Sequence, residues 1–252
     1  MVVHRDATLL ARAVAARLVT RLVDAQSARG SASVVLTGGG IGIATLTELC
    51  RSPARDAVDW RRLDVWWGDE RFLPAGDPER NDTQARAALL DAVPVDPVRM
   101  HPMGASDGPD GDDPEAAADR YAAALQAATR PEDHSDVPTF DVLLLGIGAE
   151  GHTASIFPES PAAYDARSVV AVRGAPKPPP TRLSLTFPAI NSAAEVWLLV
   201  AGAEKAPIVG LALAGVGRVQ VPAGGVMGRR RTMWLLDRAA AGDLPTALRN
   251  PW

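Results

Sequence analysis

The sequence has one cysteine, two lysines and no long apolar run, and these scarcities exclude several classes of protein. The single cysteine, Cys50, excludes an intramolecular disulfide framework and fits a reducing compartment. No apolar stretch approaches the roughly 18 residues that a membrane-spanning helix needs. The first residues also lack the basic-then-apolar layout of a signal peptide. We therefore expect a cytoplasmic protein that is not embedded in a membrane.

Arginine supplies nearly all the positive charge, because lysine occurs only as Lys177 and Lys205. Richness in Ala, Arg and Gly indicates a genome-wide composition bias, so a lysine kept against that bias is of more interest than a single arginine. The formal net charge of −4 gives no reason to expect nucleic acid or an anionic membrane as a partner. The arginine run 229–231 is too short to indicate RNA binding and is interpreted as a solvated surface feature.

Apolar strands alternate with helical segments along the whole chain. This alternation predicts an α/β fold: a doubly wound, mostly parallel sheet with helices on both faces. A hydrophobic content of 47% is ordinary for a globular protein. No repeat and no linker divides the sequence, so we expect a single α/β domain over residues 1–252. The expected strands are 33–36, 63–67, 142–145, 168–173, 182–186, 195–201 and 232–236. The expected helices are 6–29, one resuming at Ile41, 82–93 capped by Asn81 or Asp82, 115–128, a short turn at 188–193, one from about 205 to 213, and one from about Asp237.

A glycine loop, Thr37-Gly38-Gly39-Gly40, joins the first of these strands to a helix. A strand, a glycine turn and a helix start can offer free backbone N–H groups and the positive end of a helix dipole to an anion. The spacing matches neither the dinucleotide pattern GxGxxG nor the phosphate-loop pattern GxxxxGK[ST]. From the residues alone, a tight connection explains the loop as well as an anion site does.

Charged residues follow the next strand, where Gly68 is succeeded by Asp69, Glu70 and Arg71. In open α/β sheets, ligands bind beyond the carboxyl ends of strands. An exposed charged turn is the alternative, since such residues are usually on the surface. The acidic loop 104–114 lacks the spacing of a calcium-binding EF-hand and is expected to be a surface loop.

The segment 140–158 holds the most distinctive histidine of the chain. The apolar run 142–145 is short enough for a strand that is buried on both faces. Three glycines interrupt the chain directly after it, and glycine permits both a sharp turn and a close approach to a ligand. His152 follows the last of these glycines. The arrangement predicts an imidazole presented at the end of a buried strand, with a core histidine bonded to backbone as the alternative.

Four segments together resemble the 6-phosphogluconolactonases, and the match runs in order from about residue 30 to residue 210. The two middle segments are the most specific. The segments are Thr37-Gly-Gly-Gly40; Trp67-Gly-Asp-Glu-Arg-Phe-Leu-Pro74 with Arg80-Asn81; Leu145-Gly-Ile-Gly-Ala-Glu-Gly-His-Thr-Ala-Ser-Ile-Phe-Pro158; and Arg182-Leu-Ser-Leu-Thr-Phe-Pro-Ala-Ile-Asn191 with Gly202-Ala-Glu-Lys205.

The resemblance implies hydrolysis of 6-phospho-D-glucono-1,5-lactone to 6-phosphogluconate in the oxidative pentose phosphate pathway. It also implies a fold similar to glucosamine-6-phosphate deaminase and ribose-5-phosphate isomerase, and no metal or organic cofactor. The expected partner is a small phosphorylated sugar lactone, with no nucleic acid and no membrane. Relatives in this family are often monomers, so we expect a monomer or weak oligomer.

Lactone hydrolysis requires an activated water, an acceptor for its proton and donors that face the oxyanion. His152 is the expected base, and Asp69 or Glu150 is expected to orient its imidazole or to contact sugar hydroxyls. The resemblance places the substrate's phosphate on the loop Thr37, Gly38, Gly39 and Gly40, with Arg71, Arg182 and Lys205 as cations.

Two departures from the family pattern affect this site. The family's first loop usually continues with hydroxyl residues and proline, which Gly40, Ile41 and Gly42 replace here. Backbone N–H donors survive that change, although a side-chain hydroxyl contact does not. The aspartate that usually precedes Gly-His is Glu150 in this chain, which keeps the charge and adds a methylene.

Two other functions compete with the lactonase prediction. A glucosamine-6-phosphate deaminase or isomerase shares the Gly-His pair, but it carries a ring-opening glutamate five residues beyond the histidine, where this chain has Phe157. A sugar-phosphate-binding protein without turnover would bind phosphate independently of His152. The intact base and the missing glutamate favour hydrolysis over both.

Overall fold

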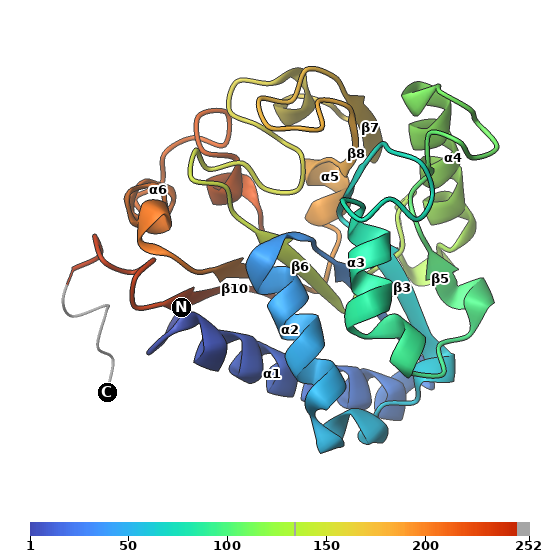
Figure 1. Ribbon diagram of the computed structural model, residues 1–252, viewed down its shortest axis with the longest axis horizontal. Coiled ribbons are helices and arrows are strands. Elements are labelled where there is room, and N and C mark those ends of the chain that lie inside the picture. The colour runs from blue at the N-terminus through green and yellow to red at the C-terminus, as the bar shows by residue number, and fades with distance from the viewer. Residues whose placement is uncertain (134, 246–252) are drawn as a thin grey trace.

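A central sheet of seven parallel strands organises the structure, a computed structural model that describes residues 1–133 and 135–245 (Figure 1). The strand order is β1-β10-β9-β6-β2-β3-β5, and every neighbouring pair is parallel. The predicted mostly parallel sheet is therefore confirmed. Its strands are β1 (Val2–His4), β2 (Ala32–Leu36), β3 (Leu63–Trp67), β5 (Met100–His101), β6 (Val142–Gly146), β9 (Glu195–Val200) and β10 (Arg231–Asp237).

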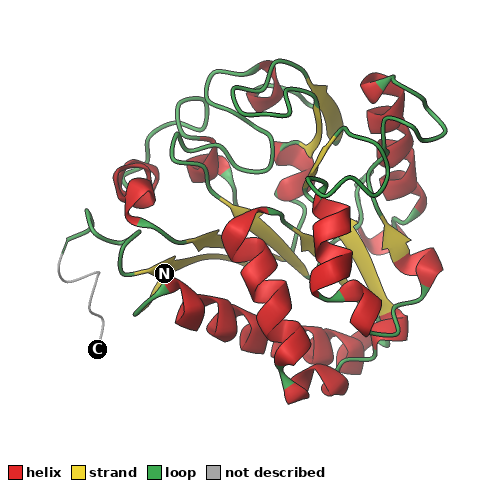
Figure 2. Ribbon diagram, in the orientation of Figure 1, coloured by secondary structure: helices red, strands yellow, loops and turns green. Residues whose placement is uncertain are grey.

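Helices cover both faces of this sheet, as expected (Figure 2). Successive side chains of β3 point to opposite faces. Val65 lies among apolar side chains of α1 and α2, whereas the indole of Trp66 packs edge-on against Tyr121 of α4, with ring centroids 5.8 Å apart. Helices α1 and α2 thus cover one face and α4 the other. The helices are α1 (Ala7–Arg29), α2 (Gly39–Arg51), α3 (Asn81–Ala88), α4 (Pro114–Ala127), α5 (Phe187–Ile190) and α6 (Ala206–Leu213).

The order of strands creates one crevice at the carboxyl edge of the sheet. From β2 the chain adds β3 and then β5 toward one edge, and it returns to place β6 on the other side of β2. Such a reversal is where open α/β sheets bind their ligands. At this point the hydroxyl of Thr37, just after β2, accepts a hydrogen bond of 3.3 Å from the backbone N–H of Gly146. The crevice between β2 and β6 therefore marks the expected site.

A second, three-stranded sheet was not expected from the sequence. It consists of β4 (Asp69–Arg71), β8 (Arg182–Leu185) and β7 (Val169–Val172), which pair antiparallel in the order β4-β8-β7. The polar triplet of β4 carries no apolar alternation, so the sequence indicated only charged residues beyond a strand. Pairing with β8 fixes the directions of its side chains instead.

Glu70 and Arg80 hold this polar segment in place. The Glu70 carboxylate, fully buried, accepts hydrogen bonds from the backbone N–H groups of Arg71, Asn81 and Asp82 at 2.6–2.8 Å. Arg80, also buried, donates to four backbone carbonyls, those of Arg71, Leu73, Met103 and Gly104.

Helix α3 starts and ends earlier than predicted. Its N-cap residue is Arg80 rather than Asn81 or Asp82, because the carboxylate that satisfies its first N–H groups comes from Glu70, 11 residues before Asn81 in the sequence. The helix ends at Ala88, and a short 3-10 turn, Leu90–Ala92, takes up the rest of the predicted segment.

The predicted helix from Asp237 is wrong for the residues up to 245, which form turns. The Asp237 carboxylate accepts hydrogen bonds from the N–H groups of Gly202 and Ala240, and Gly242 and Pro245 interrupt the segment. Residues 246–252 lie outside the described residues. Two short strands, β1 and β5, were not predicted.

Among residues 1–133 and 135–245, we find no helix with the length and apolar character needed to cross a membrane.

Candidate functional site

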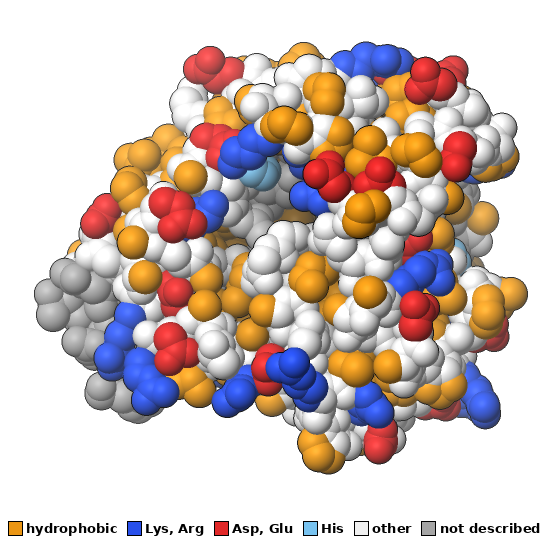
Figure 3. Space-filling view, viewed as in Figure 1, with side chains coloured by type: hydrophobic (Ala, Val, Ile, Leu, Met, Phe, Trp, Pro, Cys, Tyr) orange, Lys and Arg blue, Asp and Glu red, His pale blue; other side chains and the backbone are white. Residues whose placement is uncertain are grey.

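A cavity of about 640 Å³ opens at the crevice between the ends of β2 and β6. The space-filling view shows a hollow on this face, with a histidine and basic side chains at its walls (Figure 3). Of the ten side chains and glycines predicted to form the site, all except Glu150 line the cavity, and Glu150 lies behind its histidine. The lining residues that were predicted are Thr37, Gly38, Gly39, Gly40, Asp69, Arg71, His152, Arg182 and Lys205.

The glycine loop forms the N-terminus of helix α2 at the floor of the cavity. Gly38 is the N-cap residue, and it has no side chain that could form a capping hydrogen bond. Gly39 has φ = 79°, a conformation that suits glycine. The first N–H groups of a 13-residue helix are thus left for a ligand, and the helix dipole favours an anion there.

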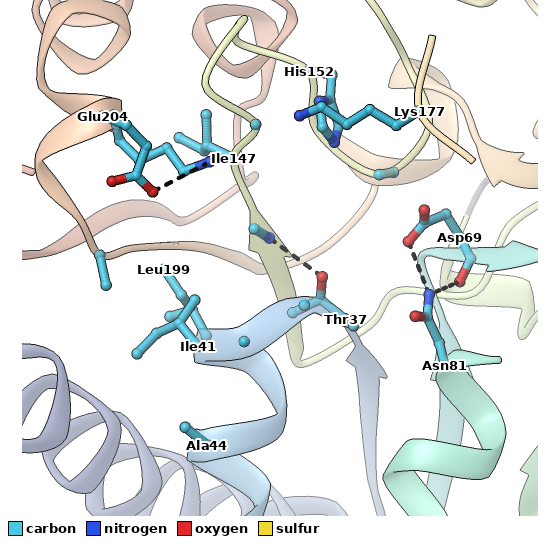
Figure 4. Close-up of a pocket in the computed structure, with 18 of the residues that line it drawn as sticks. Thr37, Ile41, Ala44, Asp69, Asn81, Ile147, His152, Lys177, Leu199 and Glu204 are labelled. Atoms are coloured by element: carbon cyan, nitrogen blue, oxygen red, sulfur yellow. Dashed lines mark hydrogen bonds and ion pairs between the residues drawn. The ribbon is translucent and has the colours of Figure 1, made fainter. Parts of the chain in front are cut away.

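The loop also requires a glycine at position 38 for a steric reason. A Cβ atom built there would lie 1.9 Å from Oδ1 of Asn81. That amide donates from Nδ2 to the backbone carbonyl of Asp69 at 2.8 Å, so it joins the loop to strand β4 (Figure 4). Oδ1 of Asn81 is buried and has no hydrogen-bond partner within the described residues.

His152 sits on the turn that follows β6. The N–H of Gly148 donates to the carbonyl of His152 at 2.9 Å, and Gly151 has φ = 92°. A Cβ at Gly148 would lie 1.9 Å from Nδ1 of the imidazole, so the ring occupies the space that only glycine leaves. The imidazole also packs on the Phe157 ring, at a centroid distance of 4.6 Å. Its position is therefore restricted by both the turn and a buried phenyl group.

Glu150 lies behind the imidazole. Its Oε1 is 3.0 Å from Nδ1 of His152, close enough for an ion pair but off the direction of an Nδ1–H hydrogen bond. Its Oε2 accepts a hydrogen bond of 2.9 Å from Nζ of Lys177. Because the carboxylate occupies the Nδ1 side, Nε2 is the nitrogen left to face the cavity, and within the described residues it makes no hydrogen bond.

The surroundings shift the pKa values of both groups. Burial lowers the pKa of His152 below its ordinary value, and the nearby ammonium of Lys177 lowers it too. The negative charges of Glu150 and Asp69 act in the opposite direction and raise this pKa. Desolvation raises the pKa of Glu150, but the hydrogen bond from Lys177, its own backbone N–H and the charge of His152 lower it to about 2. The pair is therefore a neutral imidazole beside a firmly ionised carboxylate near neutral pH.

Asp69 has a different environment. Its side chain is buried; Oδ2 accepts from the Ser155 hydroxyl at 2.7 Å and Oδ1 from Asn81 at 3.3 Å. The sequence left open whether Asp69 or Glu150 orients the imidazole, and the geometry favours Glu150. Asp69 lines the cavity, where its carboxylate can accept hydrogen bonds from hydroxyl groups.

The three predicted cations differ in how free their donors are. Nη1 of Arg71 donates to the carbonyl of Glu79, whereas its buried Nε has no partner within the described residues. Among the described residues, the ion pair that the Lys205 ammonium makes is with the Glu204 carboxylate, at 3.9 Å. Arg182 is buried and donates from Nε and Nη2 to three backbone carbonyls of residues 177–179. Arg71 and Lys205 thus keep donors for an anion, and Arg182 mainly holds a loop.

Two residues of the site were not predicted to act there. Lys177 was singled out only as a rare lysine, and its proline-rich segment gives no local sign that it returns to the His152 turn. Asn81 was interpreted as a helix cap, whereas its amide packs against Gly38 and donates a hydrogen bond to the backbone carbonyl of Asp69. Neither role follows from sequence spacing, since each depends on a contact across the fold.

No group of three or more His, Cys, Asp or Glu side chains in the described part of the chain is arranged to hold a metal ion. The expectation that the protein needs no metal or organic cofactor stays a prediction.

Known proteins share the sequence and the fold of this chain. Residues 5–234 match the sequence model of the glucosamine-6-phosphate isomerases/6-phosphogluconolactonase family. The chain is 62% identical over 252 residues to a 6-phosphogluconolactonase of Streptomyces coelicolor, covering 100% of this chain and 97% of the relative. It is 50% identical over 242 residues to a 6-phosphogluconolactonase of Mycobacterium tuberculosis, covering 96% of each. The solved structure of 6-phosphogluconolactonase from Trypanosoma brucei superposes with a TM-score of 0.82 at 30% identity, covering 97% of this chain and 98% of that one.

Proposed function

The chain belongs to the glucosamine-6-phosphate isomerase/6-phosphogluconolactonase family, and from this premise we propose how it hydrolyses 6-phospho-D-glucono-1,5-lactone to 6-phosphogluconate. The observation that carries the mechanism is the neutral imidazole of His152, backed by an ionised Glu150 and facing a cavity whose floor is a helix N-terminus. A base and an anion site in one cavity suit a lactone that bears a phosphate.

The phosphate binds at the N-terminus of α2, with Arg71 and Lys205 as its cations. Support comes from the uncapped N–H groups at Gly39 and Gly40 and from the buried, unpartnered Nε of Arg71. A dianion here is favoured both by the helix dipole and by charge-assisted hydrogen bonds. Since the phosphate is remote from the lactone carbonyl, its binding energy serves to hold that carbonyl against the base.

His152 acts on a water molecule next to the lactone carbonyl. Nε2 accepts a proton from the water as its oxygen bonds to the carbonyl carbon, and the carbonyl π electrons move to the oxygen. The imidazolium is stabilised by the negative charge of Glu150 beside Nδ1. As the tetrahedral intermediate collapses, the bond from that carbon to the ring oxygen breaks, and the proton on Nε2 passes to the departing oxygen.

The position of Phe157 separates this reaction from the isomerisation chemistry of the same family. Phe157 takes the place where the deaminases carry a glutamate; it is buried, and its ring packs on His152. A phenyl group can neither donate nor accept a proton for ring opening. The deciding assay compares acid release from freshly generated 6-phosphogluconolactone with ammonia release from glucosamine 6-phosphate. We expect only the first reaction, and ammonia release at a comparable rate would refute the assignment.

Removing the guanidinium of Arg71 should weaken recognition of the phosphate. We expect Arg71→Ala to raise KM for the phosphorylated lactone roughly 10- to 100-fold, as expected for one lost charge-assisted hydrogen bond of about 1.5–3 kcal/mol. The kinetics on unphosphorylated glucono-1,5-lactone should change little. Steady-state kinetics on both lactones measures this, with Arg61→Ala, an exposed arginine in the connection before β3, as the control. Unchanged discrimination would remove Arg71 from the phosphate site.

We further propose that the protein acts in the cytoplasm as one α/β domain and as a monomer or weak oligomer. The single cysteine supports a reducing compartment. The match of the family model across residues 5–234 supports one continuous unit.

A further inference from the structure

Lys177 reaches the catalytic histidine through a carboxylate. Its Nζ lies 2.9 Å from Oε2 of Glu150, and the other oxygen of that carboxylate lies 3.0 Å from Nδ1 of His152. The carboxylate therefore contacts both a cation and the imidazole, and Figure 4 shows Lys177 beside His152. The mechanism above uses His152 and Glu150 and leaves Lys177 without a role.

The loop that carries Lys177 is fixed by contacts to its backbone. Arg182 donates to the carbonyls of Lys177, Pro178 and Pro179 at 3.1–3.2 Å, and the N–H of Ala175 donates to the carbonyl of Pro180 at 2.9 Å. Arg182 is 5% exposed and its guanidinium lies 5.7 Å from the Phe157 ring centroid, the same ring that packs on His152. These contacts therefore hold the backbone that carries Lys177 in place beside the site.

The hydrogen bond from Lys177 limits the freedom of Glu150. A glutamate that is 31% exposed and lies on a glycine turn has several rotamers open to it. With Oε2 fixed by Lys177, Oε1 is kept toward Nδ1 of His152. The extra methylene of glutamate relative to aspartate makes such a tether more useful, because it adds one more torsion to be fixed.

We propose that Lys177 is a positioning residue of the reaction: it tethers the Glu150 carboxylate against His152 and moderates the strength of that base. This inference rests on the proposed role of His152 as the base. Lys177 need not touch the lactone or its phosphate to act in this way.

The charged groups around the imidazole act in opposite directions. Glu150 and Asp69 favour the imidazolium, Lys177 disfavours it, and burial lowers the pKa of His152 most strongly. Arg182, 5.7 Å from the centroid of the Phe157 ring that packs on His152, is a further cation near the imidazole. Removing Lys177 should therefore raise the pKa of His152, and removing the charge of Glu150 should lower it further. The two substitutions are therefore expected to shift the pKa of His152 in opposite directions.

Proton NMR of the imidazole Cε1 signals measures the titration of His152 without any substrate. The chain has four histidines, so His152→Ala assigns the relevant signal by its loss. We expect Lys177→Met to move the His152 midpoint to higher pH and Glu150→Gln to move it to lower pH. Lys177→Arg should return it toward the parent value. Lys205→Met is the matched control, since it removes the other lysine of the same cavity and should leave the midpoint in place.

Steady-state kinetics of the Lys177 variants is the second measurement. We expect Lys177→Met to lower kcat roughly tenfold through looser placement of the base, to shift the acid limb of kcat/KM to higher pH, and to leave KM within a few-fold. Substitution should not release the loop, because Arg182 holds backbone carbonyls. An unmoved His152 midpoint with a large rise in KM would overturn the proposal and make Lys177 a phosphate ligand. A parent enzyme that titrates as expected but hydrolyses no lactone would instead refute the proposed function.

Discussion

The variant His152→Ala should lose lactonase activity by about 10²–10⁴ in kcat, the range that a positioned general base contributes. Nε2 of this imidazole is the proposed proton acceptor. Its neighbour Glu150 lies behind the imidazole with Oε2 held by Lys177, so it is poorly placed to substitute for the base. Binding of 6-phosphogluconate should persist within a few-fold, since the phosphate contacts lie at the N-terminus of α2. Single-turnover kinetics and calorimetric titration with 6-phosphogluconate measure the two effects separately.

The control for this variant is His101→Asn. His101 stacks on Trp66 with ring centroids 3.8 Å apart and lines a different cavity. Its replacement should leave kcat within a factor of two to three of the parent, a margin of about 0.5 kcal/mol. If His152→Ala turns over the lactone within a few-fold of the parent, the assignment of the base is wrong. If the variant fails to bind 6-phosphogluconate, His152 contributes to substrate binding rather than to proton transfer.

The second large effect is expected for a single added methyl group. A Cβ at position 148 would lie 1.9 Å from Nδ1 and 2.2 Å from Cε1 of His152, and 2.5 Å from Oε2 of Glu150. These atoms belong to side chains, so the imidazole and carboxylate can move away while the backbone turn stays. We expect Gly148→Ala to lower kcat by about 10²-fold, because a displacement of about 1 Å at a reacting group has that effect. Stopped-flow assay of lactone hydrolysis measures it.

Thermal unfolding separates displacement of the base from loss of the fold. Gly148→Ala should unfold within a few degrees of the parent, corresponding to about 1 kcal/mol or less. Gly210→Ala is the matched exchange: it lies within α6, and apart from the backbone of its own helix and its chain neighbours no atom of the described residues comes within 4 Å of its added Cβ. That control should keep full activity and gain roughly 0.5–1 kcal/mol of stability from better helix propensity. A fully active Gly148→Ala protein would show that the imidazole position is not critical.

The sequence was sufficient where a local pattern decides the structure. Helix α1 begins after the cap Asp6 and ends at Gly30, which has φ = 78°, as its periodicity and its terminal glycine predict. Strand β6 is a continuous apolar run, and the glycines after it place His152 at the cavity. The glycine loop and His152 could be chosen because they follow the ends of β2 and β6, whereas the cations Arg71, Arg182 and Lys205 came from the resemblance to the 6-phosphogluconolactonases.

The sequence was insufficient where contacts between distant segments decide the structure. Strand β4 has no apolar pattern and exists because it pairs with β8. The cap of α3 is a carboxylate from Glu70, so the usual capping residues Asn81 and Asp82 misplaced the helix start. Arg182 appeared equivalent to the other cations, although its donors serve the carbonyls of a proline-rich loop. No sequence pattern encodes such pairings.

The pairing of β1 with β10 bears on the order in which the sheet folds. Strand β1, residues Val2–His4, lies far along the sequence from its partner β10, residues Arg231–Asp237. Parallel pairing over such a distance is slow, because the chain entropy of a long loop is lost before the contacts form. The pair β2 and β3 is adjacent in the sheet and close in sequence, so this half of the crevice can assemble early. Closure of the sheet edge by β1 can then come only after β10 has been made.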